Sequence, residues 1–341
     1  MPACRNDEND RRKVFAMNHM NTQASSSDAR RKPWLALLAS LVLPGLGQFY
    51  NGQPNRAIWL FLTFALLSIP GFALVALYLP DGWMVPALGA GLLMTLTIWI
   101  YGMWQAWHTA RTMREYRVKA WQISGVYALI FVLCDFVSLP LLTMYVREHQ
   151  VEPFRIPSRS MEPSVLQGDY IFADKRYNCP GCRQGVHRGD IAIFAYPNDR
   201  SVRYIKRVIA LPGDLVEYRN QQISVNGQPL QRAPAGALAG THVEQLDGRS
   251  WQVSHQSSAQ QPSPEAGLPP LNRAPGKPAT EITLRVPDGQ VFVLGDNRGL
   301  STDSRAFGTV PLQDILGRAR QVWFSSDQGS IRWDRLGLVL Q

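Results

Sequence analysis

The run RYIKRVIAL, residues 203–211, decides how the second half of this chain folds. Its β-branched, aromatic and apolar residues are typical of a strand. Side chains alternate between the two faces of a strand, so Lys206 shares one face with Tyr204 and Val208, while Arg207 lies on the other. The run therefore predicts a strand that carries Lys206 and Arg207 on opposite faces.

Short strand-like runs separated by turn residues continue on both sides of this run. Pro, Gly, Asn and Asp residues between them are typical of tight turns, and no long helical period interrupts the pattern. Residues 147–341 are therefore predicted to form an all-β domain, barrel-like or sandwich-like. The further strand-like runs are residues 190–196, 215–218, 223–225, 282–286 and 290–294.

One segment of this domain differs in composition. Residues 231–280 are rich in Ala, Gly, Pro, Ser and Gln. Such a composition favours a surface segment over a packed strand. We expect an insertion here, either a long loop or a loosely folded lobe.

Two of the four cysteines form the sequence Cys-Pro-Gly-Cys, at Cys179 and Cys182. A structural zinc would need a second such pair or a His pair at zinc spacing, and the sequence has neither. A redox-active dithiol would lack a thioredoxin-like βαβ context. A small disulfide loop between Cys179 and Cys182 fits an oxidising compartment better, and no metal site is expected.

The first half of the chain, residues 34–146, is apolar. Residues 57–79, 84–107 and 121–146 are each long enough to cross roughly 30 Å of hydrocarbon as helices. Trp and Tyr residues near the ends of these segments are typical of membrane interfaces. The sequence therefore predicts a multi-span α-helical membrane region ahead of the all-β domain.

Charge sets the orientation of these spans. The loop 108–120 carries four Lys/Arg residues, which the positive-inside rule places in the cytoplasm. Three crossings then leave residues 1–33 as a cytoplasmic N-terminus, predicted to be disordered, and put everything after residue 146 outside. A fourth apolar stretch, 34–50, is short and broken by Pro-Gly. We predict that it is a re-entrant or interfacial element packed on the other spans.

The formal net charge is +9, and much of it flanks the apolar segments. Basic residues in such places orient spans and meet lipid headgroups. No basic stripe with interleaved aromatic residues appears, so nucleic-acid binding is not indicated; the lipid bilayer is the implied partner. The two basic clusters are Arg30, Arg31 and Lys32, and then Arg111, Arg114, Arg117 and Lys119.

A serine cluster lies in the run IPSRSMEPS, residues 156–164, shortly after the last apolar segment. A serine hydroxyl is a weak nucleophile and needs a base, and no Ser-His-Asp arrangement is apparent. Lys206 is a candidate base for Ser160, because burial disfavours the ammonium form and a neutral amine can accept a proton. Spacing alone favours a different interpretation, in which Lys206 is a solvent-exposed strand lysine.

Three ordered motifs resemble those of the type I signal peptidases, membrane-bound serine proteases with a Ser-Lys dyad. Two are the runs around Ser160 and Lys206, and the third is GDNR at 295–298, continuing to STDSR at 301–305. The resemblance covers about 150–341 apart from the insertion. It implies an endopeptidase that removes N-terminal signal peptides from exported preproteins at small-X-small sites, with no cofactor.

The resemblance also implies a location and partners. Such a chain lies in the bacterial cytoplasmic (inner) membrane as a multi-pass protein, with the catalytic domain on the extracytoplasmic side. Its partners are preproteins with signal peptides, the lipid bilayer and the protein export machinery.

Roles carry over from the matched motif positions. Ser160 matches the nucleophile and Lys206 the general base. Ser158 matches a hydroxyl that joins the Ser160 backbone N–H in an oxyanion hole, and Ser301 matches a residue that orients the lysine amine. Three further residues match polar positions that support this corner: Asp303, Arg305 and Arg207.

The chain departs from the family pattern at a few positions. Arg159 stands where the family often has Gly, and Gly299-Leu300 stands where an Asp-Asn pair is common. The membrane region also exceeds the usual one or two spans. Two alternatives follow: a specialised processing peptidase of one secretion or conjugation system, and a catalytically silent membrane scaffold.

Overall fold

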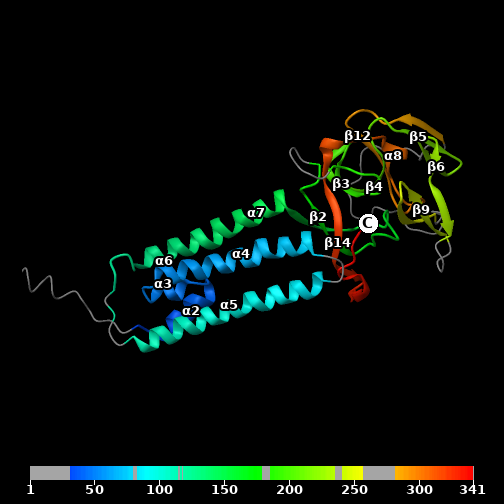
Figure 1. Cartoon of the computed structure of the whole chain (residues 1–341). Helices are drawn as coiled ribbons and strands as arrows, with labels where there is room; N and C mark the ends of the chain where they lie inside the picture. The colour runs from blue at the N-terminus through cyan, green and yellow to red at the C-terminus, as the bar shows by residue number, and fades with distance from the viewer. Residues whose placement is uncertain are drawn as a thin grey trace, which may run out of the picture. The chain divides into compact units, whose positions relative to one another are not determined.

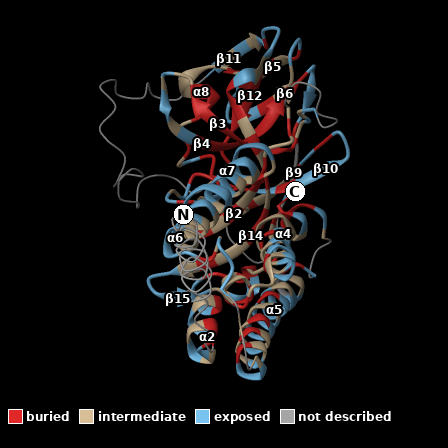
Figure 2. Cartoon of the chain, turned by 90° about the vertical axis from the view of Figure 1, so that its left-hand side faces the viewer, coloured by how far each residue is buried: buried red, intermediate tan, exposed pale blue. Residues whose placement is uncertain are grey.

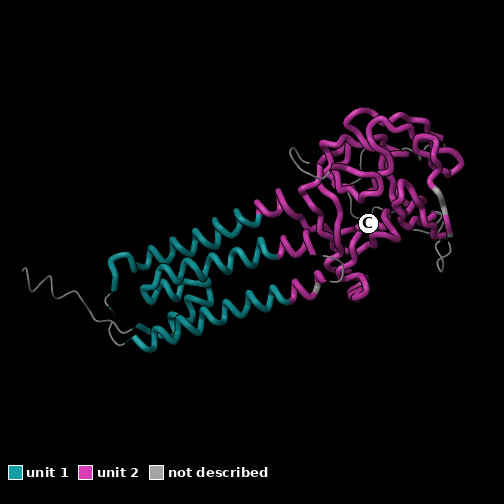
Figure 3. Tube along the Cα trace, in the orientation of Figure 1, with its two compact units in different colours: residues 1–71, 90–143 teal, residues 72–89, 144–341 magenta. Residues whose placement is uncertain are grey.

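The computed structural model describes residues 31–79, 83–113, 116, 118–178, 185–234, 240–255 and 281–340. Most of the predicted disordered N-terminus, up to residue 30, lies outside the described residues, and so does the predicted disulfide pair Cys179 and Cys182. The chain divides into two compact units (Figure 3). One comprises residues 1–71 and 90–143, and the other comprises residues 72–89 and 144–341.

Apolar helices make up the N-terminal region (Figure 1). Three helical stretches within the described residues are long and apolar enough to cross a membrane: Pro54–Tyr78, Pro86–Thr112 and Ser124–His149. Many residues on these helices are exposed (Figure 2), and many of the exposed residues are large and apolar. Such a surface is favourable in contact with lipid and unfavourable in contact with water. The helices are α4 (Pro54–Tyr78), α5 (Met84–Thr112), α6 (Ser124–Phe131), the π-helix η1 (Val132–Ser138) and α7 (Leu139–His149).

The broken segment forms two short helices, α2 (Pro33–Val42) and α3 (Leu46–Tyr50). Gly45 joins them with a φ of +99°, and a Cβ there would lie 2.4 Å from the Ala57 carbonyl oxygen, so the turn requires glycine. Two buried amides fasten the segment to α5: Gln48 Nε2 donates to the Gly102 carbonyl and Asn51 Nδ2 to the Ala106 carbonyl, each at 2.7 Å.

The C-terminal region is β-rich, built from three antiparallel sheets. The largest has the strand order β1-β2-β14-β3-β4-β12-β13, with β15 paired to β14. A second has the order β11-β5-β6-β7, and a third β10-β9-β8. In the largest sheet the strands are β1 (Val151–Arg155), β2 (Asp169–Asp174), β3 (Ile191–Tyr196), β4 (Asp199–Ala210), β12 (Gln290–Leu294), β13 (Val310–Pro311), β14 (Ile315–Asp327) and β15 (Ser330–Ile331). The other two contain β5 (Leu215–Arg219), β6 (Gln222–Val225), β7 (Gln228–Pro229), β8 (Gln231–Pro234), β9 (Thr241–Leu246), β10 (Arg249–Ser254) and β11 (Glu281–Arg285).

Strand β4 is buried on both of its faces. Ile205, Val208 and Ile209 belong to three different apolar clusters, so β4 lies where the clusters meet. Side-chain alternation then places Lys206 and Arg207 inside the domain as well, where each needs polar partners.

The first part of the expected insertion differs from a loop or loose lobe. Residues 240–255 contribute the hairpin β9–β10, whose Trp251 and Val253 are buried against residues of β5 and β6. Its turn is Asp247-Gly248, with both residues at positive φ. An Asp-Gly pair between alternating apolar residues predicts a hairpin. The average composition of residues 231–280 is loop-like, so an interpretation based on composition missed this hairpin. Residues 256–280 lie outside the described residues.

Candidate active site

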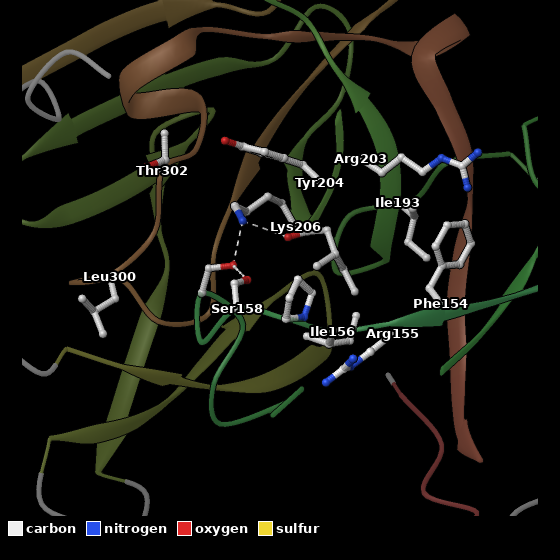
Figure 4. A pocket seen from close by; sticks show the side chains of 13 residues that line it. Phe154, Arg155, Ile156, Ser158, Ile193, Arg203, Tyr204, Lys206, Leu300 and Thr302 are labelled. Carbon is white, nitrogen blue, oxygen red and sulfur yellow. Dashed lines mark hydrogen bonds between the residues drawn. The ribbon is translucent and has the colours of Figure 1, made fainter. Parts of the chain in front are cut away.

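Ser160 and Lys206 lie side by side in the β-rich unit, although 46 residues separate them in sequence. Lys206 is on β4, and Ser160 is in the turn-rich segment after β1. The Lys206 Nζ donates to the Ser160 Oγ at 2.9 Å and to the Ile205 carbonyl at 3.0 Å (Figure 4). Ser160 is 7% exposed and Lys206 4%. The alternative of a solvent-exposed strand lysine is therefore wrong.

Neighbouring apolar residues hold Ser160 in place. Met161 and Val165 are fully buried and pack with Ile156 beneath the serine. From the other side, the Asn297 backbone N–H donates to the Ser160 carbonyl at 3.1 Å. The serine side chain is thus presented to Lys206 by a segment anchored at both ends.

The Ser158 hydroxyl lies next to the Ser160 hydroxyl. Its Oγ is 3.2 Å from the Ser160 Oγ, and Ser158 lines the same cavity as Lys206. A donor in this position can reach charge that develops on a carbonyl oxygen attacked by Ser160.

Ser301 lies beside the site but does not make the predicted contact with the lysine. Its Oγ is buried and has no hydrogen-bond partner among the described residues. It packs instead against Gly295, where an added Cβ would lie 2.1 Å from the Ser301 Oγ and 2.5 Å from the Ser160 carbonyl oxygen. Gly295 therefore permits the close approach of two segments of the site.

Gly295→Ala is expected to lower the free energy of unfolding by about 2 kcal/mol, because the new methyl group meets the Ser160 backbone, which cannot rotate away. Thermal unfolding of the purified protein would measure the loss. Gly185→Ala is the matched control, since a Cβ at Gly185 meets nothing within 4 Å. Equal stability of the two variants would contradict this account of Gly295.

Asp303 and Arg305 form a buried ion pair next to Gly295. The Arg305 Nε and Nη2 each donate to the Asp303 carboxylate at 2.8 Å, and the Gly295 N–H donates to it at 3.0 Å. Burial alone would raise the pKa of Asp303, but the hydrogen bonds from Arg305 outweigh it and hold the pKa below its usual value. The ionised carboxylate thereby ties α8 (Ser304–Phe307) to Gly295.

Arg207 pairs with the residue that follows Gly295. Its Nε and Nη2 donate to the Asp296 carboxylate at 2.9 and 2.7 Å, and its Nη1 donates to the Gly189 carbonyl at 2.6 Å. Strand alternation turns Arg207 to the face of β4 opposite Lys206. Its support of the corner of Asp303 and Arg305 stays a prediction.

Three supporting residues received no role from the sequence. Asn297 holds the Ser160 segment through its backbone N–H and also donates its Nδ2 to the Arg159 carbonyl at 3.1 Å. Arg298 pairs with Glu244 of β9 through both guanidinium nitrogens, and both side chains are buried. Asn297 and Arg298 were visible in the GDNR motif, whereas Glu244 lay in the segment expected to be a loop.

A cavity of about 180 Å³ is lined by Ser160 and Lys206. Its wall is mainly apolar and comes from β1, β3, β4 and the segment after residue 299 (Figure 4). Leu300, one of the departures from the family pattern, is part of it. The lining residues are Phe154, Arg155, Ile156, Pro157, Ser158, Ser160, Ile193, Arg203, Tyr204, Ile205, Lys206, Leu300 and Thr302.

The other departure, Arg159, is accommodated at the surface. Its Nε lies 3.1 Å from Glu162, and the Arg159 side chain is about half exposed. The bulky residue between the two serines therefore does not enter the cavity. Within the described residues, no group of three or more His, Cys, Asp or Glu side chains is arranged to hold a metal ion.

Comparisons with known proteins agree on one family. The profile of the family described as "Signal peptidase, peptidase S26" matches residues 128–324. Signal peptidase I of Rickettsia prowazekii (strain Madrid E) is 33% identical over 222 residues, which cover 58% of this chain and 78% of that protein. Signal peptidase I of Pseudomonas fluorescens is 30% identical over 235 residues, covering 60% and 77%. A crystal structure of signal peptidase I from Enterococcus faecalis V583 is 27% identical, covers 39% of this chain and 95% of that chain, and has a TM-score of 0.23.

Proposed function

This chain belongs to the peptidase S26 family of signal peptidases, and on that premise we propose that Ser160 and Lys206 are the nucleophile and the general base of its reaction. The chain is a serine endopeptidase that removes signal peptides from preproteins. The observation that carries the proposal is the buried 2.9 Å contact between the Lys206 Nζ and the Ser160 Oγ.

The first half of the reaction forms an acyl-enzyme. The neutral Lys206 amine takes the Ser160 proton as the Oγ attacks the carbonyl carbon of the scissile bond. The tetrahedral intermediate then collapses, the C–N bond breaks, and the Lys206 ammonium gives its proton to the leaving amine. Burial favours this role because it destabilises the charged form of the lysine before the attack.

The second half regenerates the enzyme. Lys206, neutral again, takes a proton from a water molecule as the water oxygen attacks the acyl carbon. Collapse of the second intermediate breaks the bond to the Ser160 Oγ, which recovers a proton from Lys206. The signal peptide leaves with a new carboxylic acid, which loses its proton to solvent.

The oxyanion of each intermediate is stabilised by the Ser160 backbone N–H and the Ser158 hydroxyl. The 3.2 Å distance between the two serine oxygens supports this role for Ser158. Ser158→Ala should lower kcat about 100-fold and leave KM nearly unchanged, because the donor acts on charge that exists only in the transition state. Steady-state kinetics would measure both; a rise in KM with an unchanged kcat would instead assign Ser158 to substrate binding.

Cleavage-site mapping tests the substrate specificity. The proposed subsite is the cavity next to Ser160, whose small volume and apolar wall suit a small side chain. We expect the purified full chain in detergent to cut a preprotein directly after the −1 Ala of an Ala-X-Ala site. Replacing that Ala by Phe should abolish the product, as measured by mass spectrometry. Cleavage of one preprotein within a varied panel would favour the specialised processing peptidase instead.

We also propose a three-span topology in the bacterial inner membrane, with the β-rich domain on the extracytoplasmic side. Three apolar helical stretches and the basic residues of loop 108–120 support it. In this arrangement lipid and the protein export machinery are partners. The substrate's own apolar helix keeps the scissile bond near the membrane, so the enzyme meets it at a high effective concentration.

A further inference from the structure

A second cavity, of about 340 Å³, lies in the helical unit between the start of α2 and the last turn of α5. Among the described residues that line it, three are basic and none is acidic. The peptidase reaction proposed above makes no use of these side chains. The lining residues are Arg31, Lys32, Pro33, Trp34, Ala110 and Arg111.

Arg31 brings a buried positive charge to this cavity. The residue is only 9% exposed. Its guanidinium lies 4.3 Å from the ring centroid of Tyr50 and 4.1 Å from that of Tyr116, and its Nη2 donates to the Gln122 Oε1 at 2.9 Å. Its Nε has no hydrogen-bond partner among the described residues, and no carboxylate within that part of the chain pairs with it.

A buried cation without a counter-ion is costly. The two aromatic rings and Gln122 hold the Arg31 guanidinium in position but do not neutralise its charge. An anion bound in the cavity would supply the missing charge, so the contacts of Arg31 point to an anionic ligand.

Two more cations and a helix end face the same ligand. Lys32 and Arg111 are both exposed, and neither forms an ion pair in the described part of the chain. Helix α2 begins at Pro33 with no side-chain cap. Pro33 has no N–H, and the N–H groups of Leu35 and Ala36 donate to the Lys32 carbonyl, so the helix contributes the positive end of its dipole rather than a set of free N–H groups. This combination suits a phosphate group.

The level of the cavity along α5 indicates where the phosphate comes from. The apolar stretch Pro86–Thr112 ends one residue after Arg111, so the cavity lies where hydrocarbon gives way to headgroups. The exposed side chain of Trp34 is typical of that interface. We propose that this cavity binds the phosphate of an anionic phospholipid headgroup, held by Arg31, Lys32 and Arg111 beside the positive end of α2.

The proposal requires that these helices lie in a bilayer, but it is independent of the Ser160–Lys206 chemistry. A bound lipid would join the start of α2 to the end of α5. A soluble phosphate shares the same chemistry, so a test must separate the two sources.

The test is lipid binding to the full chain in dodecyl maltoside, followed by native mass spectrometry. Dioctanoyl phosphatidylglycerol is titrated against dioctanoyl phosphatidylcholine, which has the same tails but no net charge. The test variant is the double substitution Lys32→Gln and Arg111→Gln. The matched control is Arg56→Gln with Lys119→Gln, which removes the same charge from exposed residues outside the cavity.

We expect phosphatidylglycerol to bind the wild type and the control variant equally, and both more tightly than phosphatidylcholine. The Lys32/Arg111 variant should bind phosphatidylglycerol at least about tenfold more weakly, because each cation near anionic headgroups contributes substantially. Equal binding by both double variants would overturn the site. A third result would be displacement of the lipid by millimolar inorganic phosphate from the wild type but not from the Lys32/Arg111 variant. That result would show that the site binds soluble phosphate rather than a lipid headgroup. Unchanged thermal unfolding of all variants would show that the fold is intact.

Discussion

Ser160→Ala is expected to lower kcat/KM for a preprotein with an Ala-X-Ala site by about 10⁴-fold or more. The substitution removes the only atom that can form the acyl-enzyme, while the cavity beside it stays intact. Binding should persist, so KM should change little. Ser160 makes its polar side-chain contacts with Lys206 and Ser158 alone among the described residues, and thermal stability should therefore fall only slightly.

The matched control is Ser201→Ala. Ser201 is an exposed serine on β4, and its hydroxyl donates only to the nearby Asp199 in the described structure. Its loss should leave kcat/KM within about twofold, as is usual for surface substitutions. Full activity of Ser160→Ala would remove the nucleophile assignment. A Ser160→Ala variant that loses cleavage yet keeps the biological role of the chain would favour the membrane scaffold alternative.

Lys206→Met is expected to cost a similar factor, about 10⁴-fold in kcat/KM. Methionine fills much of the same buried space, so the fold should survive while the base is lost. Lys206→Arg separates a base from a simple positive charge, because a guanidinium stays protonated and cannot accept the serine proton. An active Lys206→Arg variant would show that only the charge matters.

The two substitutions should not be additive. If Ser160 and Lys206 act as a unit, removing either one already abolishes the rate acceleration that needs both. The double variant Ser160→Ala with Lys206→Met should therefore have about the same kcat/KM as either single variant. Steady-state kinetics on the three variants would measure the coupling. A loss of kcat/KM in the double variant equal to the product of the two single losses would mean that Ser160 and Lys206 act independently. Such a result would contradict a dyad built on the 2.9 Å contact between their side chains.

Local patterns were enough to predict much of the β-rich domain. The runs around β3, β4, β5, β6, β11 and β12 have alternating side chains and clear turn residues, and all six strands are present. The same alternation separates Lys206 from Arg207. The partner of Arg207, Asp296, lies next to Gly295, and the strand period alone could not name it.

The hairpin β9–β10 shows where composition misleads. Residues 231–280 average to a loop-like composition, yet residues 240–255 hold an Asp-Gly turn between strands that bury Trp251. Its Glu244 meets Arg298 in a buried ion pair, and Arg298 belongs to the motif beside Ser160. No local signal links those two residues, because their pairing depends on how the sheets pack.

The sequence by itself determined the apolar helices, the β-rich domain and the family, because these depend on local periodicity and on short ordered motifs. Only the tertiary structure decided that Lys206 is buried against Ser160, that Ser301 packs on Gly295, and that Arg31 lines a cavity with no carboxylate partner in the described part of the chain. Distances and burial between residues far apart in the chain come from the packing of whole elements, and the residues of any one element do not specify them.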